Sequence, residues 1–71
     1  MFGIERRNKI LSLLHDKKSI TVQDMAVLFN VTEETIRRDL RAMESKGLVI
    51  RAHGGAVLAD DINMEISLEI R

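Results

Sequence analysis

The chain has 71 residues, a formal net charge of zero, no cysteine and only two aromatic residues, Phe2 and Phe29. This length allows one small domain whose core lies near the lower limit for independent stability. The sequence has no apolar run long enough for a membrane span, no signal-peptide pattern and no possible disulfide, so the cytoplasm is the expected location. Two aromatic side chains are also too few for a platform on which single-stranded bases stack.

The neutral total hides an uneven distribution of charge. Residues 1–58 hold ten Lys/Arg and seven Asp/Glu, a net charge of +3, whereas residues 59–71 hold one Arg and four acids, a net charge of −3. A modestly basic domain is therefore expected to precede an acidic segment. A charge of +3 does not by itself indicate nucleic-acid binding, because many domains without that role reach it.

A first helix is expected from residue 4 to about residue 16. Ile10, Leu13 and Leu14 recur at the spacing of one helical face, with Leu11 at its margin. Three cations stand near the start of this helix: Arg6, Arg7 and Lys9. We expect them to form a solvated helix face rather than to contact phosphates.

The second expected helix, residues 22–29, is preceded by a capping pattern. Thr21 can act as its N-cap, with Asp24 three residues later in the position of a capping box. Asn30 follows the helix and tolerates the left-handed backbone that a tight turn between helices needs.

The third expected helix, residues 33–45, begins with the same pattern. Thr32 can act as its N-cap, and Glu33 and Glu34 stand at the positive end of the helix dipole. Two helices joined this tightly must cross at a steep angle, which predicts a helix-turn-helix.

The faces of the third helix differ in character. At about 100° per residue, Ile36, Leu40 and Met43 form one apolar edge, whereas Arg37 and Asp39 lie on opposite flanks. The outer side carries Glu34, Thr35, Arg38, Arg41, Ala42 and Ser45. Because Arg bonds guanine edges in pairs and Thr reaches bases or phosphates, this pattern is typical of a helix that enters a major groove.

The same charges also fit a plain solvated face. In that interpretation Glu33 pairs with Arg37 and Glu34 pairs with Arg38, each at a spacing of four residues. For an isolated charged helix we would favour this interpretation, but the surrounding helix-turn-helix favours DNA binding.

A β-hairpin is expected after the third helix. Gly47 can take the left-handed position that ends the helix, residues 48–53 alternate as a strand, and residues 56–58 return. Gly54-Gly55 is expected to form the two-residue turn between them, and Ser19-Ile20 to add a short edge strand. The predicted fold class is mainly α with a small β-hairpin, a three-helix winged helix-turn-helix over residues 1–58.

Residues 59–71 carry weaker signals. Asp60-Asp61-Ile62-Asn63 resembles a polar linker, and residues 64–71 alternate apolar and polar side chains. We interpret this segment as a linker and the start of a C-terminal effector domain that the 71 residues do not include.

Four motifs give the chain a resemblance to the DeoR family of bacterial transcriptional regulators over residues 5–58. They are Glu5-Arg6-Arg7 before Ile10-Leu11, Thr35-Ile36-Arg37-Arg38-Asp39-Leu40, Gly47-Leu48, and Arg51-Ala52-His53-Gly54-Gly55-Ala56. The resemblance implies a winged helix-turn-helix that binds double-stranded operator DNA, most often as a repressor of sugar or nucleoside catabolism. It also implies a homo-oligomer whose C-terminal domain senses a phosphorylated sugar.

The family resemblance and the angular positions together nominate the DNA contacts. Thr35, Arg37 and Arg38 match the family's recognition-helix motif, and the wing motif supplies three more positions. The angular positions agree for Thr35 and Arg38, whereas Arg37 lies on the flank and is expected to contact backbone phosphates or to pair with an acid. The full set of candidates is Thr32, Glu34, Thr35, Arg37, Arg38, Arg41, Arg51, His53 and Gly54. Asp39 is expected to hold an arginine or a backbone donor in place rather than to contact DNA.

Three other functions are weighed against DNA binding. An enzyme is disfavoured, because the chain has only two histidines, no cysteine, no phosphate-binding loop and no zinc-ligand spacing, and no cofactor or metal is expected. A winged-helix protein-interaction module would more naturally present an apolar outer face on the third helix. Double-stranded RNA is disfavoured because its deep, narrow major groove excludes such a helix.

Overall fold

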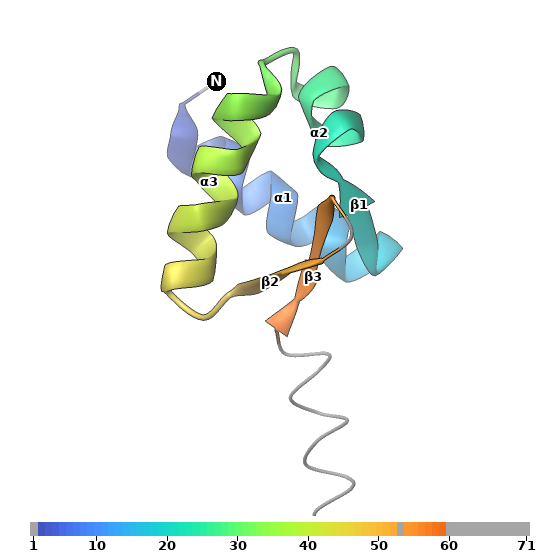
Figure 1. The fold of residues 1–71 in the computed structure, drawn as a ribbon, viewed down its shortest axis with the longest axis vertical. Helices are drawn as coiled ribbons and strands as arrows, with labels where there is room; N and C mark the ends of the chain where they lie inside the picture. The colour runs from blue at the N-terminus through green and yellow to red at the C-terminus, as the bar shows by residue number, and fades with distance from the viewer. Residues whose placement is uncertain (1, 53, 60–71) are drawn as a thin grey trace, which may run out of the picture.

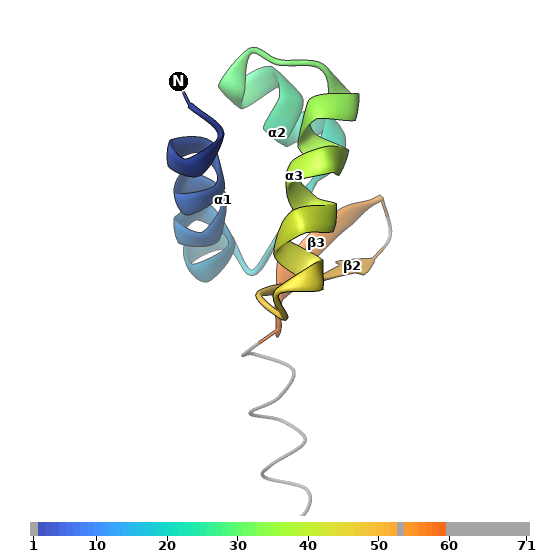
Figure 2. The ribbon, with the colours of Figure 1, turned by 90° about the vertical axis from the view of Figure 1, so that its left-hand side faces the viewer.

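A computed structural model describes residues 2–52 and 54–59. Three helices and three strands follow one another in the order α1 (Gly3–Lys17), β1 (Ser19–Thr21), α2 (Val22–Phe29), α3 (Glu33–Ser45), β2 (Val49–Ala52) and β3 (Gly55–Leu58). In Figure 1, α1 runs behind α3 and the sheet lies beneath α2; Figure 2 shows α1 and α3 side by side. The predicted winged helix-turn-helix is confirmed.

The sheet is antiparallel with strand order β1-β3-β2, so β3 is the central strand. Ile20 pairs with Ala56 on one side of β3, and Arg51 pairs with Ala56 on the other. The expected edge strand at Ser19-Ile20 is therefore confirmed, and it connects the hairpin to the start of α2. No helix in the part of the chain that the structure describes has the length and apolar character to cross a membrane.

Local signals set the ends of the helices as the sequence predicts. The Thr21 hydroxyl accepts a hydrogen bond from the Asp24 backbone N–H at 3.0 Å, and the Thr32 hydroxyl accepts one from the Thr35 N–H at 3.2 Å. Asn30 has a φ of 56°, in the left-handed region, and Gly47 has a φ of 76°. The helix-turn-helix is thus fixed by capping at both helix starts and by one left-handed residue between them.

One core joins all the elements except β1, whose Ile20 packs against its edge. Its largest fully buried side chains are Ile10, Leu14, Met25, Ile36, Leu40, Met43 and Val49. Leu13, which the periodicity places on the core face of α1, is only partly buried. The predicted apolar edge of α3 is buried completely, so the opposite side of α3 faces outward.

The turn of the hairpin differs from the prediction. Ala52 pairs directly with Gly55, which is the first residue of β3. The connection is therefore one residue earlier than the Gly54-Gly55 turn expected from the sequence. Gly54 keeps a turn conformation, with a φ of 74°, whereas Gly55 is a buried strand residue.

Gly55 is required because two backbones meet at its position. A Cβ atom there would lie 2.2 Å from the Ile20 carbonyl oxygen and 2.8 Å from the Thr21 Cα. We expect Gly55→Ala to lower the free energy of unfolding by about 1–3 kcal/mol, because backbone atoms cannot give way as a side chain would. Urea unfolding followed by circular dichroism measures the loss.

Gly54→Asn is the matched control for that substitution. A Cβ at this position would meet nothing within 4 Å, and Asn tolerates a positive φ. We expect its unfolding midpoint to stay close to that of the wild type. Equal midpoints for Gly55→Ala and the wild type would contradict the close approach of β1 and β3.

Candidate nucleic-acid interface

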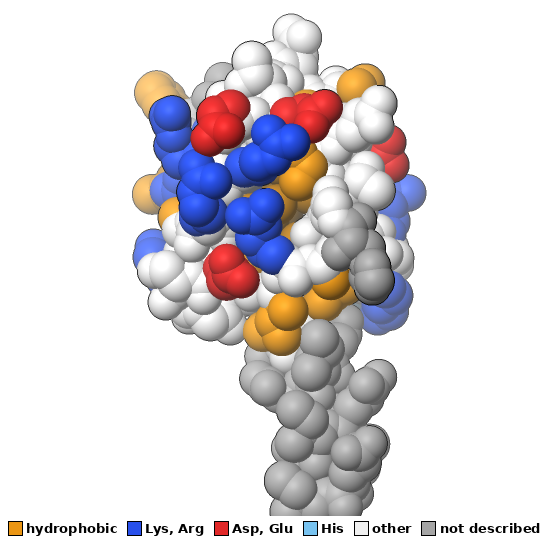
Figure 3. Space-filling model, in the orientation of Figure 1, with side chains coloured by type: hydrophobic (Ala, Val, Ile, Leu, Met, Phe, Trp, Pro, Cys, Tyr) orange, Lys and Arg blue, Asp and Glu red, His pale blue; other side chains and the backbone are white. Residues whose placement is uncertain are grey.

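Arginines gather on the outward side of α3. Figure 3 shows Lys and Arg side chains clustered in front of this helix, with acidic side chains around them. Arg37 and Arg41 retain side-chain exposures of 41% and 53%, and Arg38 is also exposed. The three arginines that the sequence placed on the outer side and flank of the helix therefore all reach solvent.

Ion pairs hold two of these three arginines. Arg37 donates to Glu33 at 3.0 Å, but Glu34 accepts from Arg41 at 3.0 Å rather than pairing with Arg38. Of the two ion pairs in the solvated-face interpretation, the structure therefore has Glu33–Arg37 and not Glu34–Arg38. Arg41 follows Glu34 by seven residues, which is nearly two full turns, so the two long side chains stand on the same face of the helix. The hydrogen bond from Arg41 lowers the pKa of Glu34, which keeps this carboxylate ionised.

Arg38 differs from its neighbours. Within residues 2–52 and 54–59 it takes part in no ion pair and no side-chain hydrogen bond. Its five N–H donors are therefore available to a ligand without first breaking a contact inside the protein.

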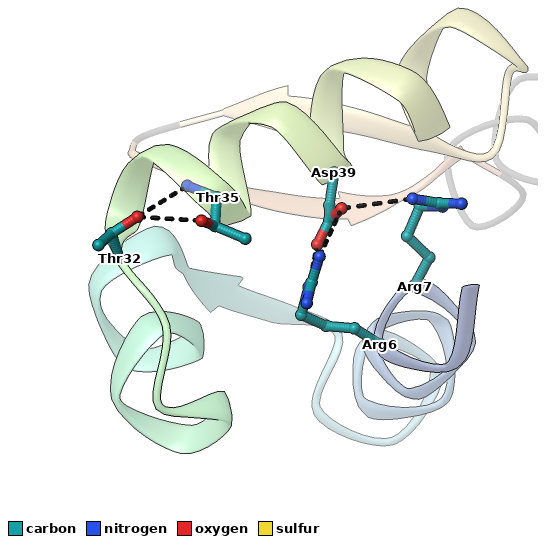
Figure 4. Close-up of polar contacts among 5 residues, drawn as sticks. All are labelled: Arg6, Arg7, Thr32, Thr35 and Asp39. Carbon is teal, nitrogen blue, oxygen red and sulfur yellow. Dashed lines mark hydrogen bonds and ion pairs between the residues drawn. The ribbon is translucent and has the colours of Figure 1, made fainter. Parts of the chain in front are cut away.

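Two threonine hydroxyls meet at the start of α3. Their oxygens, Thr32 Oγ1 and Thr35 Oγ1, are 3.0 Å apart, and Thr32 also caps the helix (Figure 4). The exposed Thr32 hydroxyl thus has a structural task, while Thr35 is half-buried at the outer edge of the helix. The two groups can still offer hydrogen bonds to a ligand that approaches this end of α3.

Asp39 anchors α3 to α1. It is the one buried charged residue among the described residues, and both its oxygens accept from Arg6, one of them from Nη2 at 3.2 Å. Arg7 donates to the same carboxylate at 3.4 Å (Figure 4). The hydrogen bond to Asp39 raises the pKa of Arg6. The expected structural role of Asp39 is confirmed.

The interpretation of Arg6 and Arg7 as members of a solvated helix face is wrong. The Arg6 side chain is only 13% exposed and that of Arg7 is 31% exposed. Thirty-three residues separate Arg6 from Asp39. No local pattern in the sequence signals a contact at that separation, because it depends on how α1 crosses α3.

The wing, formed by β2, β3 and their connection, comes close to α3. Arg51 and Gly54 from the wing line the same open notch as Arg37 from α3. The Val22 N–H donates to the Gly54 carbonyl at 2.9 Å, which ties the tip of the wing to the start of α2. His53 lies outside the described residues, so its place in the interface stays a prediction.

The fold therefore brings most of the predicted residues to one side of the molecule. Thr32 caps the start of α3, Glu34, Thr35, Arg37, Arg38 and Arg41 belong to this helix, and Arg51 and Gly54 belong to the wing. Sequence reasoning missed Gln23, which lines the notch beside Arg37 and Arg51. A Gln in the first turn of a capped helix gives no signal that a wing folds against it.

The chain matches the family model for the DeoR-like helix-turn-helix domain over residues 6–61. A putative galactitol utilization operon repressor of Escherichia coli is 52% identical over 56 residues, which is 79% of this chain and 50% of that protein. The transcriptional regulator GolR of Listeria innocua is 47% identical over 58 residues, 82% of this chain and 23% of that protein.

A third relative aligns with the entire chain. It is the transcriptional regulator YulB of Bacillus subtilis, 41% identical over 71 residues and 28% of that protein's length. This chain thus spans half or less of the length of these three relatives. No solved structure matches the chain significantly.

These relatives carry the names of transcriptional regulators rather than of enzymes, in keeping with the expectation from the sequence. The family model covers residues 6–61, which include all of α2, α3 and the three strands and all but the first three residues of α1. The chain belongs to the DeoR-like helix-turn-helix family.

Proposed function

We propose that this chain is the sequence-specific operator-binding domain of a transcriptional repressor. The recognition helix α3 enters the major groove of double-stranded DNA, and the wing lies on the adjacent backbone or minor groove. One observation carries this proposal: Arg38 projects, without a partner among the described residues, from a helix that is capped at its start and anchored through Asp39. Such a side chain is ready to read a base edge.

The other candidate residues have different parts in the proposed complex. Arg38 bonds a guanine edge, while Thr32, Glu34 and Thr35 stand at the end of α3 that meets bases or the neighbouring phosphates. Arg41 contacts phosphate once its pair with Glu34 opens. Arg51, His53 and Gly54 act from the wing.

The names of the relatives support a role in sugar metabolism. One similar protein is named as a putative repressor of a galactitol utilization operon, and another as a putative repressor of the aga operon. We accordingly propose that the full-length protein is a cytoplasmic homo-oligomer that controls sugar-utilisation genes. A domain outside these 71 residues then binds a phosphorylated sugar as the effector.

A protein-interaction module is the competing proposal. Its docking surface would be expected to be apolar, but the outer side of α3 carries ion pairs and Arg38, which has no partner among the described residues. A salt titration of binding to random duplex DNA separates the two. For a DNA-binding domain the logarithm of the binding constant falls linearly with the logarithm of the salt concentration, whereas an interaction module does not bind the duplex.

Arg38→Ala tests base reading directly. We expect it to weaken binding to the specific site by about 1–3 kcal/mol and to relax base preference at one position of each half-site. Selection from a randomised duplex pool, made with the wild type and with the variant, identifies that position.

Arg41→Ala is the control on the same helix. It is expected to weaken binding to all sequences alike, because a phosphate contact carries no base information. Equal losses on specific and random DNA for Arg38→Ala would show that Arg38 only positions the protein.

A further inference from the structure

An open notch lies where the recognition helix, the start of α2 and the wing meet. Its volume is about 340 Å³, and the residues that matter for its chemistry are Gln23, Glu33, Arg37, Arg51 and Gly54. Two arginines and one glutamate thus line the same space. These three side chains, two from α3 and one from β2, give the notch a net charge of +1.

Both arginines keep donors free for a ligand. Arg37 uses Nη2 to reach Glu33 at 3.0 Å, and its Nη1 is 4.0 Å from a Glu34 oxygen. Arg51 forms no ion pair within residues 2–52 and 54–59 and is only partly exposed. Since each guanidinium has five N–H donors in a planar fork, most of the hydrogen-bonding capacity in the notch is unused.

The notch is held in shape before any ligand arrives. The hydrogen bond from Val22 to Gly54 fixes the tip of the wing against α2, and the pairing of Ala52 with Gly55 fixes the strand that carries Arg51. The Arg37 side chain, in turn, is steadied by Glu33 one helical turn earlier. A ligand is therefore bound with little further ordering of the backbone.

The position of the notch indicates which anion fits it. A helix in the major groove and a wing over the adjacent minor groove must straddle one DNA strand, because the sugar-phosphate backbone separates the two grooves. The notch lies between these two elements. A guanidinium group can bond two phosphate oxygens at once, so a phosphate suits a notch that two arginines line.

We propose that the notch binds a single phosphate of the DNA backbone, gripped jointly by Arg37 and Arg51, with the Gln23 side chain as a third donor. This inference rests on the proposed operator-binding function. It assigns Arg37 to the backbone rather than to a base. It also means that the two arginines bind the same phosphate together, although one belongs to α3 and the other to β2.

A double-mutant cycle on the 71-residue chain tests the joint grip. Arg37→Ala and Arg51→Ala are each expected to weaken binding to operator and random duplexes alike, by about tenfold. The double variant is expected to bind only slightly more weakly than the single variant with the lower affinity, because the same phosphate contact disappears in all three variants. The salt dependence gives a second measure of the same result. The slope of the logarithm of the binding constant against the logarithm of the salt concentration counts the phosphates that the protein neutralises, so in the double variant the magnitude of this slope is expected to fall by about one unit rather than two.

Neutral backbone substitutions locate the phosphate. Methylphosphonate is placed at one position at a time along a duplex that the wild type binds. We expect one position per half-site at which the substitution weakens binding by the wild type but leaves the Arg37→Ala/Arg51→Ala variant unaffected.

Two matched controls, at Arg41 and Glu44, use residues of α3 that do not line the notch. Arg41→Ala combined with Arg51→Ala is expected to be additive, because Arg41 does not line the notch. Glu33→Gln is expected to raise affinity for every duplex several-fold, because removing a negative charge beside the phosphate outweighs the loss of an exposed ion pair that steadies Arg37 only weakly. Glu44→Gln makes the same change of charge on an exposed residue at the far end of α3 and is expected to have a smaller effect.

Additive losses for Arg37 and Arg51, a slope change of two units, or separate methylphosphonate positions for the two arginines would overturn the joint phosphate site. Native circular dichroism in each variant keeps these results independent of folding. Failure of the wild type to bind any duplex would instead overturn the operator-binding function itself. If the wild type binds duplex DNA but the losses in the double-mutant cycle are additive, only the proposed phosphate site in the notch is overturned.

Discussion

Asp39→Ala is expected to destabilise the domain by about 3–5 kcal/mol, because it leaves the nearly buried Arg6 without its counter-charge. That amount is comparable to the whole stability a core of this size supplies. Much of the variant should therefore be unfolded, and its DNA binding lost with the fold. Urea unfolding followed by the helical circular dichroism signal measures the change.

Two comparisons separate the buried charge from a general loss of a carboxylate. Glu44→Ala removes an exposed acid from the same helix and is expected to leave the unfolding midpoint almost unchanged. Arg6→Met combined with Asp39→Leu removes the buried carboxylate together with the less exposed of its two arginine partners. It is expected to recover much of the stability, since the one arginine left without its carboxylate, Arg7, is 31% exposed and can be solvated. An unfolding midpoint for Asp39→Ala equal to that of Glu44→Ala would show that the ion pair between Arg6 and Asp39 is not needed for the stability of the domain.

Dimerisation is expected to raise operator affinity by about 10²- to 10⁴-fold. The 71-residue chain offers one recognition helix, so as a monomer it contacts a single half-site. Fusing it through a flexible linker to an unrelated dimerisation domain makes the second contact intramolecular, which increases the effective concentration at the other half-site. Affinity is measured on a palindromic site selected with the fused protein.

The control for the fusion is a duplex that contains only one half-site. There the fused and unfused proteins are expected to bind within a few-fold of each other. Full operator affinity for the unfused chain, shown to be monomeric by ultracentrifugation, would contradict this prediction. Saturable binding of a phosphorylated sugar to the 71-residue chain, measured by calorimetry, would contradict the proposed placement of the effector site in another domain.

The sequence was sufficient for the features that depend on neighbouring residues. The caps at Thr21 and Thr32 and the left-handed positions of Asn30 and Gly47 follow from interactions that span at most four residues. Helical periodicity likewise identified the buried edge of α3, and with it the outward direction of Arg38. For this reason the winged helix-turn-helix and most of the candidate interface were predictable.

The errors arose where two choices were equally compatible with the local sequence. Either Gly54-Gly55 or the pair one residue earlier fits a two-residue hairpin turn, and only the approach of β1 to Gly55 selects the register. Arg38 and Arg41 both lie within reach of Glu34. The structure pairs Glu34 with Arg41, which leaves Arg38 without a partner among the described residues.

The sequence alone therefore determined which segments form helices and strands, and which side of α3 faces outward. Only the tertiary structure decided that Arg6 is tied to Asp39 and that Arg37 and Arg51 share a notch. Capping and periodicity act between residues that are close in the chain, so they can be read from the order of residues. The crossing of α1 over α3 and the folding of the wing against α2 depend on how complete side-chain surfaces pack, and that information is not local.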